Sequence, residues 1–141
     1  MIKIAEALWS PEPSRLSRLC SQAGVQYAVG GLPVVEATGA TPEEPWDFLP
    51  LLRLQEDYRA AGFELIVIEA RPPLNKAKRG LPGRDEEIET VCRLIENMGK
   101  LHIPIWCYEW MTDFNWLRTA TAVRGRGGSL VSEFDASKMA G

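Results

Sequence analysis

Residues 106–119 bring together the side-chain types that a small polar ligand requires. They read WCYEWMTDFNWLRT and include three tryptophans, a tyrosine, a cysteine, two acidic residues and an arginine. Ligand pockets use aromatic rings for their shape and a few charged groups to orient the ligand. The segment overlaps the end of an apolar run at residues 103–106, so these groups would stand where a strand ends. The alternative is a strand end that packs beneath a long loop.

Other candidate residues also follow predicted strands. In parallel α/β folds, ligands bind at the carboxyl ends of the strands. We therefore assign substrate binding to six residues at these positions: Trp9, Glu69, Tyr108, Glu109, Trp110 and Arg118. An arginine among aromatic rings can hold a carboxylate through two parallel hydrogen bonds. The alternatives are a surface salt bridge for Arg118 and, for Glu69, a loop cap or an ion pair with Arg71. The sequence assigns no catalytic residue and no metal ligand.

Strand and helix patterns alternate along the chain. Apolar strand patterns occupy residues 2–8, 25–29, 63–69 and 103–111. The run at 63–69 is almost continuously apolar, which is typical of a parallel strand covered on both faces. The expected single domain consists of strand-helix units at 2–24, 25–62 and 63–102, the fourth strand and a loop or hairpin at 112–141. Four parallel strands and three helices fit either an open doubly wound sheet or a section of a β/α barrel.

Polar residues ahead of the helical patterns predict where the helices begin. Ser10 precedes Pro11, and this order favours a serine N-cap with proline in the first helical position. Thr41 opens the sequence TPEE, which fits a capping box. Asp85 stands before two glutamates and is the expected N-cap of the third helix.

Two further patterns concern the third helix and the end of the chain. The helical spacing predicts one buried face that contains Ile88, Val91, Cys92 and Ile95. The glycine-rich residues 125–128 are expected to turn a hairpin between residues 120–123 and 129–134. The tail from residue 135 onward is predicted to lack a closing element.

Composition limits the class of protein. The chain has 141 residues, a net charge of −3 and a pI near 5.3, so it lacks the basic character typical of nucleic-acid binding. No apolar run is long enough to span a membrane, and the N-terminus lacks a signal-peptide pattern. Three cysteines without paired spacing argue against a disulfide framework. We therefore expect a cytoplasmic protein.

Three stretches of this sequence resemble the mannonate dehydratase family. That family shows a VIES-P stretch, then G-LP-RD before a helix, then CYNFMPVFDWTRTD. The corresponding stretches here are VIEARP, GLPGRDEE and CYEWMTDFNWLRT. The matching residues are Glu69, Pro72, Leu81, Pro82, Arg84, Asp85, Cys107, Tyr108, Met111, Phe114, Trp116, Arg118 and Thr119. Trp9 is similar to a tryptophan that follows the family's first strand.

The resemblance implies the N-terminal half of a xylose-isomerase-like (β/α)8 barrel (TIM barrel). It implies a lyase that dehydrates D-mannonate to 2-keto-3-deoxy-D-gluconate in D-glucuronate catabolism, with manganese or iron (Mn²⁺ or Fe²⁺) as a Lewis acid. The family is more than twice as long as this chain, and its metal ligands come from later strands. We therefore expect those ligands beyond residue 141 and an inactive chain in isolation. The expected partners are a sugar acid and either a second copy of the chain or a C-terminal half.

The sequence also departs from the family pattern. The departures are Leu74 for a loop histidine, Glu109 for asparagine, Thr112 for proline, and Asn115 and Ala120 for aspartates. They indicate a divergent member that acts on a related sugar acid. Two other functions stay open, because a fold does not fix a reaction. One is a sugar isomerase or epimerase of the same barrel class, and the other is a non-catalytic half-barrel that associates with a partner.

Overall fold

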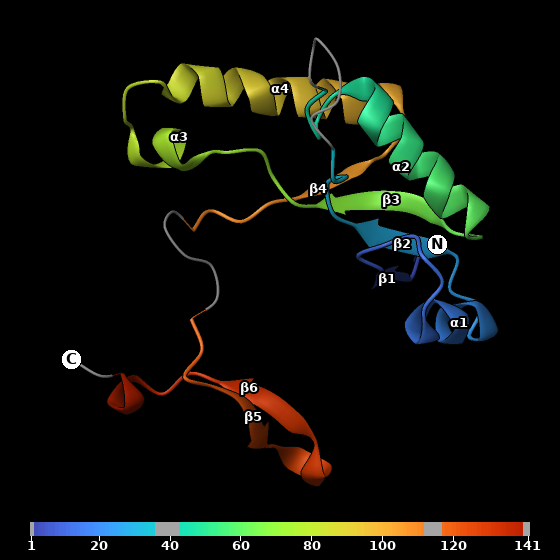
Figure 1. Cartoon of the computed structure of the whole chain (residues 1–141), viewed down its shortest axis with the longest axis vertical. Helices are drawn as coiled ribbons and strands as arrows, with labels where there is room; N and C mark the ends of the chain where they lie inside the picture. The colour runs from blue at the N-terminus through green and yellow to red at the C-terminus, as the bar shows by residue number, and fades with distance from the viewer. Residues whose placement is uncertain (1, 36–42, 112–116, 140–141) are drawn as a thin grey trace. The chain divides into compact units, whose positions relative to one another are not determined.

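The computed structural model describes residues 2–35, 43–111 and 117–139. The chain divides into two compact units, Met1–Trp110 and Met111–Gly141, and each is described by itself. The first contains a parallel sheet with its helices, and the second contains a hairpin (Figure 1). Whether both units belong to one domain stays a prediction.

A four-stranded parallel sheet forms the centre of the first unit. Its strands are β1 (Ala5–Ala7), β2 (Tyr27–Gly30), β3 (Glu64–Glu69) and β4 (Ile105–Cys107). They lie in the order β1-β2-β3-β4, and every neighbouring pair is parallel. The predicted sequence of four parallel strands is confirmed, although each observed strand is shorter than its apolar pattern. The carboxyl ends of all four strands consequently meet at one edge of the sheet.

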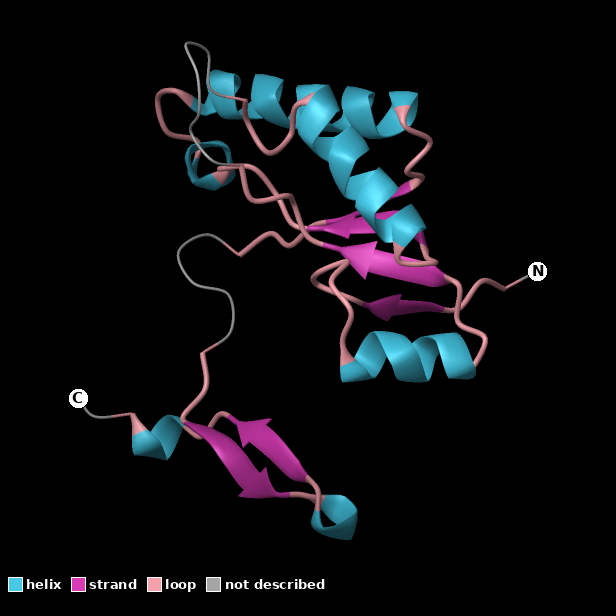
Figure 2. Cartoon of the chain, turned by 45° about the vertical axis from the view of Figure 1, so that its right-hand side comes forward, coloured by secondary structure: helices cyan, strands magenta, loops and turns pink. Residues whose placement is uncertain are grey.

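Among the described residues, four helices connect these strands, one more than the three that the sequence predicts. They are α1 (Arg15–Gln22), α2 (Phe48–Ala60), α3 (Asn75–Arg79) and α4 (Arg84–Lys100). Helix α2 packs on β3 and on α4 (Figure 2). The additional helix α3 lies where the sequence predicts only a loop, and it packs beside α4. A helix of five residues is too short to show a periodic pattern of apolar residues in the sequence. Gly80 ends α3 in a left-handed conformation with φ of 66°.

Two of the predicted N-caps, Ser10 and Asp85, are wrong. The N-cap of α1 is Ser14, whose Oγ accepts from the backbone N–H of Ser17 at 3.0 Å. Ser10 instead accepts from the N–H of Glu12 in a local turn ahead of the helix. Helix α4 begins at Arg84 after Gly83, and Asp85 therefore lies in its first turn, where its charge suits the helix dipole. Helix α2 begins at Phe48 rather than near Thr41, which lies outside the described residues.

The hydrophobic core lies between the sheet and the helices α2 and α4, and Cys20 of α1 also belongs to it. Its fully buried members include Leu51, Tyr58, Ile68 and Leu94. The hydroxyl of Tyr58 donates to the backbone carbonyl of Leu8, so it joins α2 to the end of β1. Burial raises the pKa of the Tyr58 phenol. Tyr58 therefore contributes both apolar contact and a buried hydrogen bond.

The buried face of α4 differs from the predicted one. Ile88 is 45% exposed and Ile95 is 49% exposed, and Cys92 is also exposed. The buried residues of this helix are Leu94, Asn97 and Met98. Asn97 donates from its Nδ2 to the carbonyl of Trp46 at 3.0 Å. The sequence of this helix contains two apolar stripes, one with Ile88 and Ile95 and one with Leu94 and Met98. Only the second is buried, because that side of the helix faces α2 and the core.

The second unit is an antiparallel hairpin. Strand β5 (Ala120–Arg124) pairs with β6 (Leu130–Glu133), and the turn between them contains the short 3-10 helix η1 (Arg126–Gly128). The predicted hairpin and its glycine-rich turn are confirmed. A second 3-10 turn, η2 (Ala136–Lys138), lies in the tail that was predicted to have no closing element.

None of the helices within residues 2–35, 43–111 and 117–139 has the length and apolar character that a membrane span requires.

Candidate functional site

Three aromatic rings form a series that begins in β4 and continues past its carboxyl end. The rings of Trp106 and Tyr108 stack with their centroids 5.0 Å apart, and Trp110 meets Tyr108 edge-on at 6.5 Å. Trp106 is anchored because its Nε1 donates to the carbonyl of Ala70 at 2.7 Å. Tyr108 and Trp110 are 56% and 63% exposed. The predicted residues Tyr108 and Trp110 therefore present apolar ring surface to solvent at a strand end, where a ligand can reach it.

Glu109 pairs with two cations from the connection that follows β3. The Nε of Arg71 lies 2.7 Å from both carboxylate oxygens of Glu109. The Nζ of Lys78, in α3, donates to the backbone carbonyl of Glu109 at 2.7 Å and lies 3.5 Å from its Oε1. The Lys78 side chain is completely buried, while that of Glu109 is 25% exposed. This cluster of Arg71, Lys78 and Glu109, which we call the strand-end ion cluster, ties β4 to the β3–α4 connection.

The environment of Glu109 favours its ionised form. Partial burial by itself would raise the pKa of the carboxyl, but the hydrogen bond and charge of Arg71, with a smaller effect from Lys78, lower it. The stabilisation from this cluster is therefore present above the ordinary pKa of 4.5 and is lost as the pH falls through the lowered value. At neutral pH Glu109 is a carboxylate that accepts hydrogen bonds.

Glu69 ends β3 on the face of the sheet opposite the core. It is in register with Cys107 of β4, and both residues are exposed. Side chains alternate along a strand, so Glu69 and Cys107 point away from the side on which Ile68 joins the core. The ion pair with Arg71, one alternative for Glu69, is replaced by the pair between Arg71 and Glu109.

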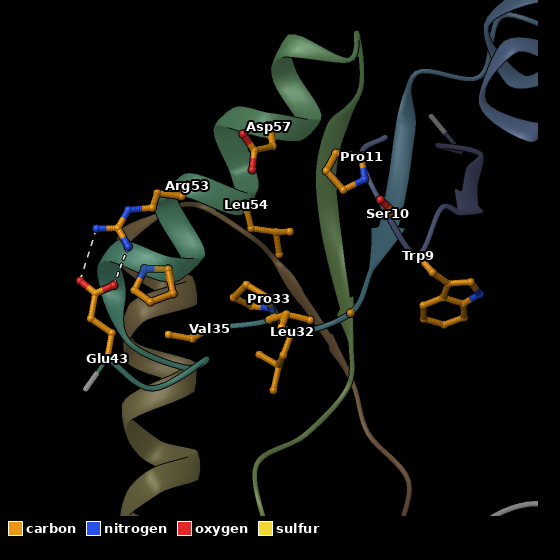
Figure 3. A pocket seen from close by; sticks show the side chains of 13 residues that line it. Trp9, Ser10, Pro11, Leu32, Pro33, Val35, Glu43, Arg53, Leu54 and Asp57 are labelled. Carbon is orange, nitrogen blue, oxygen red and sulfur yellow. Dashed lines mark hydrogen bonds and ion pairs between the residues drawn. The ribbon is translucent and has the colours of Figure 1, made fainter. Parts of the chain in front are cut away.

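Trp9 borders a separate hollow at the carboxyl ends of β1 and β2. The hollow has a volume of about 500 Å³ and is bounded by the loops after these strands and by α2. Figure 3 shows Arg53 and Asp57 on α2 and Trp9 after β1 among the lining side chains. Arg53 donates two hydrogen bonds, from Nη1 and Nη2, to the two carboxylate oxygens of Glu43. The sequence interpretation missed Arg53 and Asp57, whose spacing of one helical turn is their only signal.

Arg118 belongs to the second compact unit. Its Nε donates to Ser132 Oγ at 3.1 Å and its Nη1 to the carbonyl of Leu117 at 2.8 Å. These contacts hold the guanidinium against its own hairpin segment. The five other predicted residues, Trp9, Glu69, Tyr108, Glu109 and Trp110, lie in the first unit. A role for Arg118 in substrate binding stays a prediction.

The described side chains do not fit the metal that the resemblance implies. In the part of the chain that the structure describes, no three His, Cys, Asp or Glu residues lie close enough together to hold a metal ion. We therefore derive no chemical step through a metal from these residues.

The parallel order β1-β2-β3-β4 with connecting helices is that of the first half of a β/α barrel. Residues 10–141 match the family model "D-mannonate dehydratase (UxuA)", and the chain belongs to this family. It is 38% identical over 96 residues to a mannonate dehydratase of Streptococcus equi subsp. zooepidemicus, a match that covers 68% of this chain and 24% of that relative. It is 35% identical over 115 residues to the Thermotoga maritima mannonate dehydratase, covering 79% and 30%.

A solved structure agrees with these matches. The crystal structure of mannonate dehydratase from Streptococcus suis serotype 2 superposes with a TM-score of 0.79 at 29% sequence identity. The superposition covers 100% of this chain and 39% of the other. The chain thus spans less than half the length of the relatives it matches.

Proposed function

We propose that this chain contributes to the dehydration of D-mannonate to 2-keto-3-deoxy-D-gluconate, a hydro-lyase reaction of D-glucuronate catabolism. The observation that supports this most is the family match over residues 10–141, because it includes the strand-end residues Glu69, Tyr108, Glu109 and Trp110. The three cysteines are free thiols, which suits the reducing cytoplasm.

The reaction defines what these residues have to do. Dehydration of an aldonate removes a proton from the carbon beside the carboxylate and a hydroxyl from the next carbon, and the resulting enol becomes a ketone. The ligand therefore has a carboxylate to be oriented and hydroxyl groups that can donate. In the proposal, Glu69 accepts hydrogen bonds from substrate hydroxyls, and the exposed faces of Tyr108 and Trp110 pack against the carbon chain.

A chimera tests the proposed reaction. In it, this chain replaces the matched part of the Thermotoga maritima relative, so that the remaining two thirds or so come from an enzyme named for this activity. We expect the chimera to form 2-keto-3-deoxy-D-gluconate from D-mannonate and the chain alone to form none. The control is the unaltered relative, and circular dichroism establishes that the chimera is folded. A folded chimera that dehydrates another aldonate and not D-mannonate would change the substrate.

We further propose that the manganese or iron of the complete enzyme is held by donors outside the described residues. The purified chain is accordingly expected to bind Mn²⁺ or Fe²⁺ weakly or not at all. Isothermal titration calorimetry of the chelator-treated chain with MnCl₂, and anaerobically with an iron(II) salt, measures this. Tight binding of one ion per chain would contradict the prediction, and loss of that binding in Glu69→Gln or Glu109→Gln would then locate the site.

A further inference from the structure

The guanidinium of Arg71 keeps hydrogen-bond donors available at the carboxyl end of β3. Arginine carries five N–H groups and stays charged in proteins. Here Nε donates to the Glu109 carboxylate, and Nη1 makes one long contact of 3.4 Å to the carbonyl of Pro72. Among the described residues, none accepts a hydrogen bond from Nη2. The Arg71 side chain is 18% exposed, so solvent or a ligand reaches part of this side chain.

The other two members of the strand-end ion cluster fix the orientation of this guanidinium. Lys78 binds the backbone carbonyl of Glu109 at 2.7 Å, and Glu109 in turn holds Nε of Arg71 with both oxygens. Since the Lys78 side chain is completely buried, it cannot touch a ligand. A donor that is already oriented loses little conformational entropy on binding, which favours affinity.

The same strand end offers the surface that would hold the rest of a small acid. Tyr108 and Trp110 flank Glu109 in the sequence and expose more than half of their surface. Ligand sites combine such apolar surface with a small number of fixed polar groups. Arg71 is the member of the cluster that is both cationic and partly exposed.

We propose that Arg71, oriented by Glu109 and Lys78, binds the carboxylate group of a small hydroxy acid at the carboxyl end of β3. This inference rests on the proposed function and names the residue that would hold the acid end of the substrate. Glu109 is then a positioning residue that acts through Arg71. During dehydration, negative charge moves onto the carboxylate as the neighbouring proton leaves, and a guanidinium fixed at that place stabilises it.

An NMR titration of the ¹⁵N-labelled chain tests the assignment. The probes are D-mannonate, D-gluconate and the neutral polyol D-mannitol, and the signals followed are the Arg71 Nε–Hε and the backbone amides after β3 and β4. We expect both acids to shift these signals and mannitol to leave them unchanged. The variant is the double substitution Arg71→Gln with Glu109→Gln, which removes the Arg71–Glu109 pair together. Lys78 loses the Glu109 carboxylate but keeps its hydrogen bond to the backbone carbonyl of residue 109.

The double variant is expected to bind the acids about tenfold to a hundredfold more weakly, the loss typical of a charge-assisted hydrogen bond. The matched control is Arg59→Gln with Glu56→Gln, which removes an exposed ion pair of α2 and should leave the affinity unchanged. Arg118→Gln, measured in parallel, reports on the other candidate arginine. Spectra of every variant without ligand establish that the fold is retained.

The outcomes separate this inference from the proposed function. Arg71-dependent binding of D-gluconate that equals that of D-mannonate supports the carboxylate site and counts against D-mannonate as the particular substrate. Equal affinity of the acids for the wild-type chain and the folded double variant overturns the role of Arg71, whatever the chimera does. Binding of mannitol as tight as that of the acids, or absence of binding by either acid, also overturns it. If the double variant does not fold, Arg71→Lys takes its place. Lysine keeps the positive charge but lacks the paired N–H donors of the guanidinium, so the same tenfold to hundredfold loss of affinity is expected.

Discussion

Tyr58→Ala is expected to lower the free energy of unfolding by about 3–5 kcal/mol, because it empties the space of a fully buried aromatic ring. The ring lies in the core between α2 and the sheet, and its hydroxyl donates to the carbonyl of Leu8. Tyr58→Phe keeps the ring and removes only that donor, so its expected cost is about 1–3 kcal/mol. Urea denaturation followed by circular dichroism measures both values.

Tyr27→Phe is the control for the loss of a hydroxyl, since Tyr27 is only partly buried. Its expected effect is below about 0.5 kcal/mol, as for most surface changes. If Tyr58→Phe matched this control, the hydrogen bond to Leu8 would contribute nothing measurable. The contact between Tyr58 and Leu8 would then depend on ring packing alone.

Gly30→Ala is expected to destabilise the chain by about 1–3 kcal/mol, the usual cost of an added methyl group in a filled core. A Cβ at Gly30 would lie 2.8 Å from the hydroxyl oxygen of Tyr58 and 3.0 Å from Cδ1 of Leu65. Both distances are shorter than a normal contact, so the α2 side of the sheet has to shift. The neighbouring Gly31→Ala is the matched control, because nothing lies within 4 Å of its Cβ position.

A double-mutant cycle makes the Gly30 prediction specific to Tyr58. In the Tyr58→Phe background the closest atom to the new methyl group is absent, so Gly30→Ala should cost less than in the wild type. The expected coupling is about 0.5 kcal/mol or more, as for residues in direct contact. Strict additivity of the two substitutions would show that the contacts with Leu65 and with the ring of residue 58, and not the one with the Tyr58 hydroxyl, set the cost.

The strands could be predicted from the sequence because their signals are local. The run at residues 63–69 is apolar almost throughout, and it forms β3 between two parallel neighbours. The glycine-rich turn at 125–128 likewise lies between two short strands that pair. Helix α4 was predicted as an element, but its buried face was not, because Ile88 and Ile95 form a second apolar stripe that the core leaves exposed. Local periodicity cannot choose between two such stripes.

The sequence by itself determined which kinds of groups follow the strands. It placed Trp9, Glu69, Tyr108, Glu109 and Trp110 at strand ends, and it carried the family resemblance that the comparisons confirmed. Only the tertiary structure decided which of these groups meet. Arg71 and Glu109 are 38 positions apart in the chain, and they come within hydrogen-bond distance because β3 and β4 are neighbours in the sheet. Sequence spacing carries no information about such a contact, since the pairing of parallel strands is fixed by long-range packing and not by nearby residues.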